Sequence, residues 1–354
     1  MMTEESPIQK RKADHIQIAL TREVTGRGIT TGMERYRFRH EALPEIDFSR
    51  VSLATSFLGR PLKAPFLISS MTGGTEQAGR INAALAEAAQ KRGWAMGLGS
   101  VRMAIEHPET AATFQVRSVA PDIPLLANLG AVQLNYGYGP DQCLRAVELT
   151  GADGLVLHLN AMQEVFQPEG NTRFGDLLRK IEEVCRALEV PVGVKEVGFG
   201  IHGRLARRLF DAGVQFVDVA GAGGTSWIQV EKYRAKDPLL ATAAEAFADW
   251  GLPTADCVRD VRRHVPQVCL IASGGLKTGV DAAKSIALGA DLAGFGRSLL
   301  PSAATCDPES IIRQMERIEL ECKIAMFGAG IATVDRLKGT DRLLCVGDPP
   351  VSDS

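Results

Sequence analysis

The sequence predicts an α/β protein built on a closed (β/α)8 TIM barrel, with an N-terminal arm and an extended loop after the sixth strand. Two observations favour this fold. Short apolar runs bounded by glycine alternate with segments of helical spacing, and three helical segments end in a matching phrase. Parallel strands that are covered on both faces appear as continuous apolar runs. An open doubly wound sheet is the alternative fold for the same alternation.

Eight apolar runs from Pro65 onward are the expected barrel strands. They are Phe66–Ser70, Ala95–Gly99, Leu125–Leu129, Leu155–Leu159, Val192–Lys195, Phe216–Val219, Cys269–Ala272 and Leu292–Phe295. Apolar stripes at helical spacing lie between them. The stripes are Ile81, Leu85 and Ala88; Leu177, Ile181, Val184 and Leu188; and Leu205, Leu209 and Ala212, and a last helix is expected near Ser310–Phe327.

The matching phrase is Gly151-Ala152-Asp153, Gly213-Val214-Gln215 and Gly289-Ala290-Asp291, each just before an expected strand. Glycine adopts the left-handed backbone that ends a helix at little steric cost. The recurrence therefore marks repeated βα units, and eight such units make a barrel.

Two stretches lie outside the alternation. We expect residues 1–64 to form an arm that packs on the barrel of residues 65–340, and residues 341–354 to form a C-terminal tail. Residues 226–253 follow the sixth strand and exceed the roughly 2–6 residues of an ordinary βα loop. They are either a lid on the catalytic face or a helical insertion used in oligomer contacts, and the sequence leaves both open.

Composition narrows the class of protein. The chain has 45% hydrophobic and 23% charged residues, as globular proteins do, and its formal charge of −2 favours neither nucleic acid nor a membrane surface as partner. No apolar run approaches the ~18 residues of a membrane helix. The N-terminus resembles no signal peptide and the 7 cysteines include no CxxC pair, so we expect a cytoplasmic protein.

Glycine and polar residues collect at the carboxyl ends of the expected strands, where barrels place their active sites. Gly274-Gly275-Leu276-Lys277 and Gly296-Arg297 follow the seventh and eighth strands. Barrels commonly bind phosphate there through backbone N–H groups. The absence of GxGxxG and Walker motifs disfavours a Rossmann unit or a P-loop.

The fourth and fifth strands carry the most reactive side chains. Lys195 is either a Schiff-base amine or a cation beside an anionic ring, and the residue alone does not decide. His158, Asn160, Gln163 and Glu164 follow the fourth strand. Glu164 is a candidate Mg²⁺ ligand, because Mg²⁺ needs only one or two carboxylates besides phosphate oxygens and water. Gln163 is uncharged, which makes it a hydrogen-bonding or proton-relaying candidate.

Basic residues that could meet an anion occur at two places. Arg102 and His107 lie just after the second strand, at the expected catalytic face. The pair Arg11-Lys12 lies in the arm, and by composition alone such a terminal pair is usually solvated.

Taken in this order, the motifs resemble the type 2 isopentenyl-diphosphate isomerases over about residues 10–340. They are Arg11 to Ile16, Ser70 to Gly74, Gly99 to Arg102, Asn128 to Gly130, His158 to Glu164, Lys195 to Gly198, Gly221 to Trp227 and Ala272 to Gly275. The glycine-rich pieces are shared with other flavin barrels. The segment from His158 to Glu164 and the Arg11-Lys12 pair are more specific.

The resemblance implies a homo-oligomeric barrel enzyme, a tetramer or octamer, that binds FMN and Mg²⁺. It implies interconversion of isopentenyl diphosphate and dimethylallyl diphosphate, with a flavin that NADPH reduces although the reaction has no net redox change. Moving a double bond requires a proton to be added at one carbon and removed from another, and reduced flavin would supply this acid–base chemistry.

The resemblance also implies roles for individual residues. The flavin ring and ribityl chain would be held by Ser70, Met71, Thr72, Gly73, Ser100, Asn128, Lys195 and Thr225, and the flavin phosphate by Gly275, Leu276, Lys277, Gly296 and Arg297. The substrate would be bound by Arg11, Lys12, Ser100, Val101, Arg102 and Gln163, with His158, Asn160 and Gln163 as catalytic residues and Glu164 on Mg²⁺.

Two other functions remain open at this stage. An FMN-dependent 2-hydroxy-acid oxidase or dehydrogenase usually has a histidine base and an arginine after the later strands, and this region offers only His202 and His264. A non-catalytic flavin-binding barrel, acting as a sensor or scaffold, would not need the Gln163-Glu164 pair.

Overall fold

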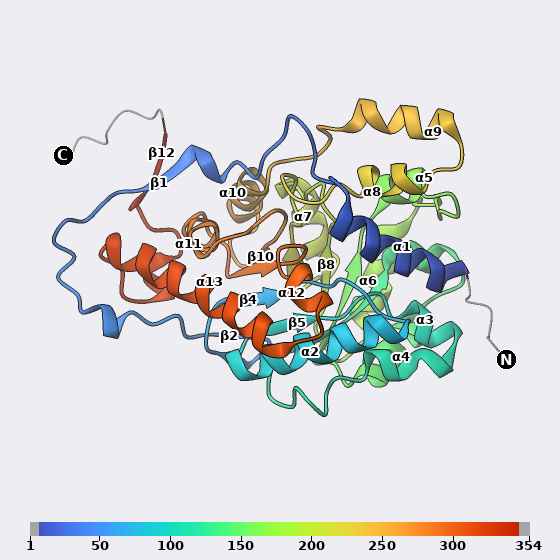
Figure 1. The fold of residues 1–354 in the computed structure, drawn as a ribbon, viewed down its shortest axis with the longest axis horizontal. Helices are drawn as coiled ribbons and strands as arrows, with labels where there is room; N and C mark the ends of the chain where they lie inside the picture. The colour runs from blue at the N-terminus through green and yellow to red at the C-terminus, as the bar shows by residue number, and fades with distance from the viewer. Residues whose placement is uncertain (1–6, 347–354) are drawn as a thin grey trace.

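Eight parallel strands close into a barrel in this computed structural model, which describes residues 7–346 of the chain (Figure 1). The barrel order is β4-β5-β6-β7-β8-β9-β10-β11, with β11 paired to β4. The predicted (β/α)8 barrel is therefore confirmed, and the open doubly wound sheet is excluded. The barrel strands are β4 Phe66–Ile68, β5 Ala95–Gly97, β6 Leu125–Gly130, β7 Gly154–His158, β8 Val192–Lys195, β9 Phe216–Asp218, β10 Cys269–Ala272 and β11 Leu292–Phe295.

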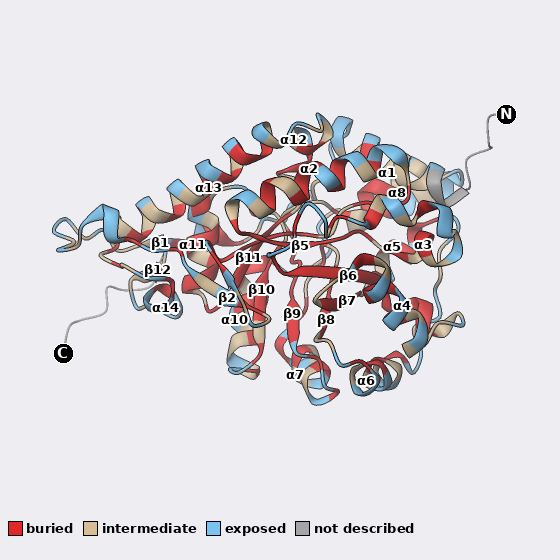
Figure 2. Ribbon diagram, turned by 90° about the horizontal axis from the view of Figure 1, so that it is seen from below, coloured by how far each residue is buried: buried red, intermediate tan, exposed pale blue. Residues whose placement is uncertain are grey.

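Helices surround the barrel, with their buried faces toward the strands and their exposed faces outward (Figure 2). They are α1 Pro7–Thr21, α2 Glu76–Arg92, α3 Arg102–Glu106, α4 Pro140–Thr150, α5 Ala161–Phe166, α6 Leu177–Ala187, α7 Gly203–Asp211, α8 Trp227–Arg234, α9 Pro238–Ala243, α10 Thr254–His264, α11 Gly279–Ala287, α12 Leu300–Ala304, α13 Pro308–Gly328 and α14 Val334–Leu337. No helix in this described part of the chain is long and apolar enough to cross a membrane.

The three glycines of the matching phrase all have left-handed backbone, with φ of 59° at Gly151, 92° at Gly213 and 115° at Gly289. Two residues after each glycine, a backbone N–H donates to the preceding strand. Asp153 reaches the Leu125 carbonyl at 2.8 Å, and the other two phrases make the same bond. The phrase thus ends a helix and fixes where the next strand starts.

In two of these phrases, on opposite sides of the barrel, an arginine bridges the glycine carbonyl and the aspartate carboxylate. Arg117 donates to the Gly151 carbonyl at 2.9 Å and to Asp153 Oδ2 at 2.6 Å. Arg262 likewise donates to the Gly289 carbonyl and to Asp291 Oδ2, each at 2.7 Å. The β6–β7 and β10–β11 joints are therefore built alike, four strands apart in the closed barrel.

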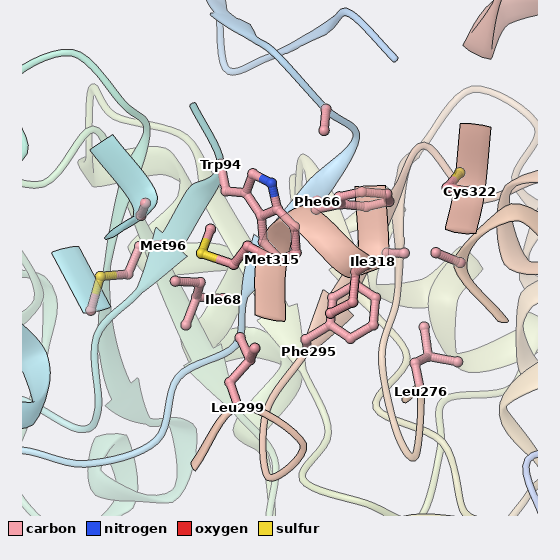
Figure 3. Close-up of a cluster of buried hydrophobic side chains, with 14 of the residues drawn as sticks. Phe66, Ile68, Trp94, Met96, Leu276, Phe295, Leu299, Met315, Ile318 and Cys322 are labelled. Carbon is pink, nitrogen blue, oxygen red and sulfur yellow. The ribbon is translucent and has the colours of Figure 1, made fainter. Parts of the chain in front are cut away.

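The largest core lies between the barrel wall and α13 (Figure 3). The rings of Phe66 and Trp94 are 4.8 Å apart, and Phe295 packs 5.6 Å from Trp94. The buried indole N–H of Trp94 donates to Glu319 of α13 at 2.8 Å, which satisfies its hydrogen bond. The last predicted helix, α13, thus holds the first, second and last barrel strands together.

A hairpin from the arm closes the amino end of the barrel. Its strands are β2 Thr55–Phe57 and β3 Arg60–Leu62. Phe57 packs 5.6 Å from Phe216, which points into the barrel interior. A Cβ at Gly193 would lie 2.0 Å from the Phe216 ring, so glycine makes room for this side chain. Water is thereby kept from this end, and the carboxyl end is left for a ligand.

The rest of the arm and the start of the tail pair with each other. β1 Tyr36–Phe38 runs antiparallel to β12 Leu343–Cys345. The division at residues 64 and 340 stays a prediction, and the tail beyond residue 346 lies outside the described residues. The long segment 226–253 follows β9 as expected and folds into α8, α9 and a short 3-10 turn, Ala244–Phe247.

Candidate active site

A cavity of about 660 Å³ opens at the carboxyl ends of the barrel strands, with α1 and α8 forming part of its wall. Nearly all the predicted site residues line it. They are Arg11, Lys12, Ser70, Met71, Thr72, Ser100, Arg102, Asn128, His158, Asn160, Gln163, Glu164, Lys195, Thr225, Gly275, Leu276, Lys277, Gly296 and Arg297. Val101 is fully buried beneath the wall, and Gly73 packs on Phe114, whose ring would lie 2.0 Å from a Cβ there.

Three cations gather on one side of this cavity. Lys12 Nζ donates to the Ser100 carbonyl at 3.1 Å, and the side chains of Arg11 and Arg102 lie nearby. Burial lowers the pKa of Lys12 to about 7, and the like charges of Arg11 and Arg102 add to this effect. Burial also lowers the pKa of Arg11. Partly desolvated cations that lie close together repel one another unless an anion binds between them. This side of the cavity is therefore suited to a diphosphate.

His158 at the end of β7 is held neutral. Burial lowers its pKa to about 3, and Lys195, Arg11 and Lys12 lower it further. Its Nδ1 is 2.7 Å from Asn128 Oδ1. Because that amide oxygen only accepts, we assign the proton to Nδ1, which leaves Nε2 as an acceptor.

Glu164 on α5 is fixed by neutral donors. Asn160 Nδ2 donates to Oε1 at 2.7 Å, and the Asn171 N–H donates to Oε2 at 2.5 Å. Asn160 Oδ1 is buried and has no hydrogen-bond partner within residues 10–346. A carboxylate has about four lone-pair positions, so Glu164 keeps capacity for a cation. Within residues 10–346, no group of three or more His, Cys, Asp or Glu side chains could hold a metal. The site therefore fits Mg²⁺ only as one carboxylate plus substrate phosphates and water.

Sequence reasoning missed Glu231, the carboxylate behind Gln163. Glu231 on α8 has 0% exposure, and its Oε1 accepts from Gln163 Nε2 at 3.1 Å. The same oxygen is 2.8 Å from His15 Nε2 on α1. The spacing of Arg11 and His15, one helical turn apart, was an available signal that both face one side of a helix. Nothing in the sequence around Glu231 marks it.

Lys195 at the end of β8 lies between His158 and Asp218 in the strand register. Its Nζ donates to the Glu196 carbonyl at 2.5 Å. Asp218 is buried and accepts from Ser273 Oγ at 2.6 Å. Burial raises the pKa of Asp218, and the positive charge of Lys195 opposes that rise. Lys195 thus brings a buried amino group to the cavity wall.

The other side of the cavity fits a phosphorylated cofactor. Gly274 and Gly275 have φ of 105° and 78°, and a Cβ at Gly224 would lie 2.5 Å from the Gly275 nitrogen. Side chains are therefore excluded where the backbone must approach a phosphate. Three buried hydroxyl oxygens near the cavity, those of Ser69, Thr72 and Ser298, have no hydrogen-bond partner among the described residues. Unpaired buried polar atoms of this kind are rare without a ligand.

The model of the FMN-dependent dehydrogenase family matches residues 5–120 and 146–343. The chain belongs to this family. The family is FMN-dependent, and the unpaired hydroxyls and the glycine turn fit a phosphorylated cofactor of that kind. The family name alone does not identify the reaction. The two histidines considered above as a possible oxidase base, His202 and His264, lie outside the cavity. His202 is the N-cap residue just before α7, and His264 is the last residue of α10.

The chain is also similar, over nearly its whole length, to curated proteins that share one name. The chain is 56% identical to the isopentenyl-diphosphate delta-isomerase of Oceanobacillus iheyensis, over 97% of this chain and 98% of the relative. It is 51% identical to the protein of that name from Nostoc sp., over 95% of each chain. The resemblance stated from the motifs is thereby confirmed.

Solved structures agree on the fold. A lactate oxidase of Pediococcus acidilactici has a TM-score of 0.66 at 19% identity, covering 96% of this chain and 93% of its own. A flavocytochrome b2 has a TM-score of 0.68 at 16% identity, covering 94% of this chain and 83% of its own. At such low identity these likenesses show the barrel and no activity.

Proposed function

We propose that the protein isomerises isopentenyl diphosphate to dimethylallyl diphosphate by acid–base chemistry with reduced FMN. The observation that carries the proposal is the pairing of a flavin-type cavity with two further groups. One is the cation group of Arg11, Lys12 and Arg102, and the other is the polar group Asn160-Gln163-Glu164. The names of the curated relatives support the same reaction.

The reaction adds a proton to the terminal alkene carbon and removes one from the carbon two positions away. An alkene is a poor proton acceptor, so the acid must face it in a pocket that excludes water. Reduced FMN supplies the acid–base chemistry when bound. The protein fixes the substrate against it: the cations bind the diphosphate, and Glu164 would hold Mg²⁺ on the diphosphate oxygens.

The polar residues around the alkene keep defined protonation states. His158 is neutral and offers Nε2 as an acceptor, so it does not add a positive charge beside a developing cation. The Gln163 amide donates to Glu231, which orients the remaining amide oxygen toward Asn160. Lys195 places a buried cation where an anionic flavin would sit. We include a cytoplasmic location, NADPH as reductant and a tetrameric or octameric assembly in the proposal, on the strength of the resemblance.

An anaerobic incubation tests the function. Protein, FMN, Mg²⁺, NADPH and isopentenyl diphosphate are mixed, and both the product and NADPH are measured. We expect many turnovers of dimethylallyl diphosphate for each NADPH consumed. A parallel aerobic arm with lactate or mandelate measures oxygen uptake. Oxygen consumption without isomerisation would replace the proposal with the oxidase, and flavin binding without any turnover would favour a non-catalytic barrel.

A further inference from the structure

Arg234, the last residue of α8, joins three segments behind the cavity wall. Its Nη1 donates to Glu231 Oε2 at 2.6 Å, and its Nη2 donates to Glu169 Oε1 at 2.9 Å. Its Nε lies 3.6 Å from Asp14 Oδ2 on α1 and is buried, with no hydrogen-bond partner in the part of the chain that the structure describes. The side chain is only 11% exposed. This guanidinium therefore connects α8, α1 and the loop after α5, which lie together in Figure 1.

The first carboxylate that Arg234 contacts, Glu231, is hydrogen-bonded to the Gln163 amide. Glu231 Oε1 accepts from Gln163 Nε2 and contacts His15 Nε2, while Oε2 belongs to Arg234. Burial favours the neutral acid, but the hydrogen bond with His15 and the charges of His15 and Arg234 hold the pKa of Glu231 below its usual value. An ionised carboxylate can only accept, so the Gln163 amide must turn its N–H toward it. Loss of the Arg234 charge would weaken this constraint, because His15 would be the remaining positively charged partner of Glu231.

The second carboxylate that Arg234 contacts, Glu169, forms an ion pair with Arg11. Glu169 Oε1, which accepts from Arg234, is also 3.8 Å from Arg11 Nη1. The Glu169 charge raises the pKa of Arg11 against the lowering effect of burial. Arg11 lines the cavity on the side of the predicted diphosphate. Glu169 thus links Arg234 to a substrate-binding cation, although neither Arg234 nor Glu169 lines the cavity itself.

We propose that Arg234 is a positioning residue for the isomerisation, which orients the Gln163 amide through Glu231 and the Arg11 guanidinium through Glu169. The inference rests on the proposed function for its kinetic part. One planar fork serves both carboxylates at once, and a lysine ammonium at this position could reach only one of them at full strength. The two links therefore predict separable effects on kcat and KM.

Four variants of the FMN-loaded enzyme test this. Arg234→Met removes both links, Arg234→Lys keeps a charge beside Glu231, and Glu169→Gln weakens only the link to Arg11. Lys232→Met is the matched control, because Lys232 is on the same helix and its Nζ donates to Glu245 at 2.7 Å, away from Glu231. Each variant is compared with wild type in kcat, in KM for isopentenyl diphosphate and in its flavin absorbance spectrum.

We expect Arg234→Met to lower kcat at least tenfold and to raise KM, with an unchanged flavin spectrum. Arg234→Lys should return kcat to within about threefold of wild type but leave KM raised, and Glu169→Gln should raise KM at nearly normal kcat. Lys232→Met should match wild type. If Arg234→Met behaves like Lys232→Met, or if Arg234→Lys restores neither parameter, the inference is wrong.

Binding of inorganic pyrophosphate separates this inference from the proposed function. Titration calorimetry of the FMN-loaded protein with pyrophosphate and Mg²⁺ requires no turnover. We expect severalfold weaker binding in Arg234→Met and Glu169→Gln than in Lys232→Met. If the wild type does not isomerise but this pattern holds, the function fails and the link to Arg11 stands. Equal binding in all variants overturns the link whatever the activity.

Discussion

The ammonium of Lys12 is a cavity cation whose charge changes near neutral pH. Its pKa is lowered to about 7, so it is protonated below pH 7 and loses its charge as the pH rises above it. A bound diphosphate favours the charged form. We therefore expect KM for isopentenyl diphosphate to rise above pH 7, by up to about tenfold per pH unit for one linked proton. Lys12→Arg, which stays charged, should show a flatter rise, and an identical pH profile in both proteins would contradict this assignment.

Glu164 is the one cavity carboxylate proposed to meet a metal. Glu164→Gln keeps its size and its bond to the Asn171 N–H but removes the charge. We expect at least about a tenfold loss of kcat/KM and a weaker dependence on Mg²⁺, with flavin still bound. The exposed Glu183→Gln on α6 is the control. Unchanged Mg²⁺ dependence in Glu164→Gln would place the metal elsewhere.

At this scale the sequence was informative only where residues share a strand end. His158, Asn160, Gln163 and Glu164 were predicted together because all four follow the fourth strand, and a barrel places its active site at the carboxyl ends of its strands. Glu231 was missed because it is a polar residue buried by a partner, His15, 216 positions away in the chain. Such a pair depends on how two helices cross, and no local pattern in either helix contains that information.

Among the elements, the arginine–aspartate joints at β6–β7 and β10–β11 carry a prediction about stability. Arg117 spans the Gly151 and Ile123 carbonyls and Asp153, and Asp153 also accepts from the Leu125 N–H. Truncating the guanidinium removes the Arg117 hydrogen bonds to the two carbonyls and one of the donors to Asp153, at a cost of roughly 1–3 kcal/mol.

We expect Arg117→Met and Arg262→Met to lower the free energy of unfolding by similar amounts. The two joints are on opposite sides of the barrel, so the losses should add in the double variant. Urea unfolding measures this, and Arg145→Met, an exposed pair with Glu148, is the control. If the double variant loses much more free energy of unfolding than the two single variants together, the joints are coupled.

Elements were predictable where burial leaves a local pattern. All eight strands were located because covered parallel strands are continuously apolar, and α6 and α7 because one face is apolar. The expected strand Phe66–Ser70 ends instead at Ile68, and Ser69 and Ser70 beyond it line the cavity. Helix α1 was missed because much of its inner face is polar, as a wall of an anion site must be.

Over the whole molecule, the arm ties the cofactor side of the cavity to the rest of the fold. Thr25 bridges to Thr225 and accepts from Arg297 at 2.7 Å. Thr31 packs where a Cβ at Gly223 or Gly275 would otherwise stand. The arm thus crosses the predicted phosphate loop, so a ligand in that loop should stabilise strand ends and arm together rather than one loop alone.

We therefore expect FMN to raise the unfolding midpoint of the whole chain in one cooperative transition, with about 2.7 kcal/mol of stabilisation at 100 times the dissociation constant. Gly275→Val should abolish this increment, because φ is 78° and the new Cβ would meet Gly223 at 2.6 Å. Gly339→Val is the matched control: its φ is 68° with open space around it, so it adds backbone strain far from any contact. Calorimetry with and without FMN decides the matter. Both variants should unfold at lower temperature than wild type, but only Gly339→Val should keep the FMN increment, and an increment retained in Gly275→Val would remove this turn from the cofactor site.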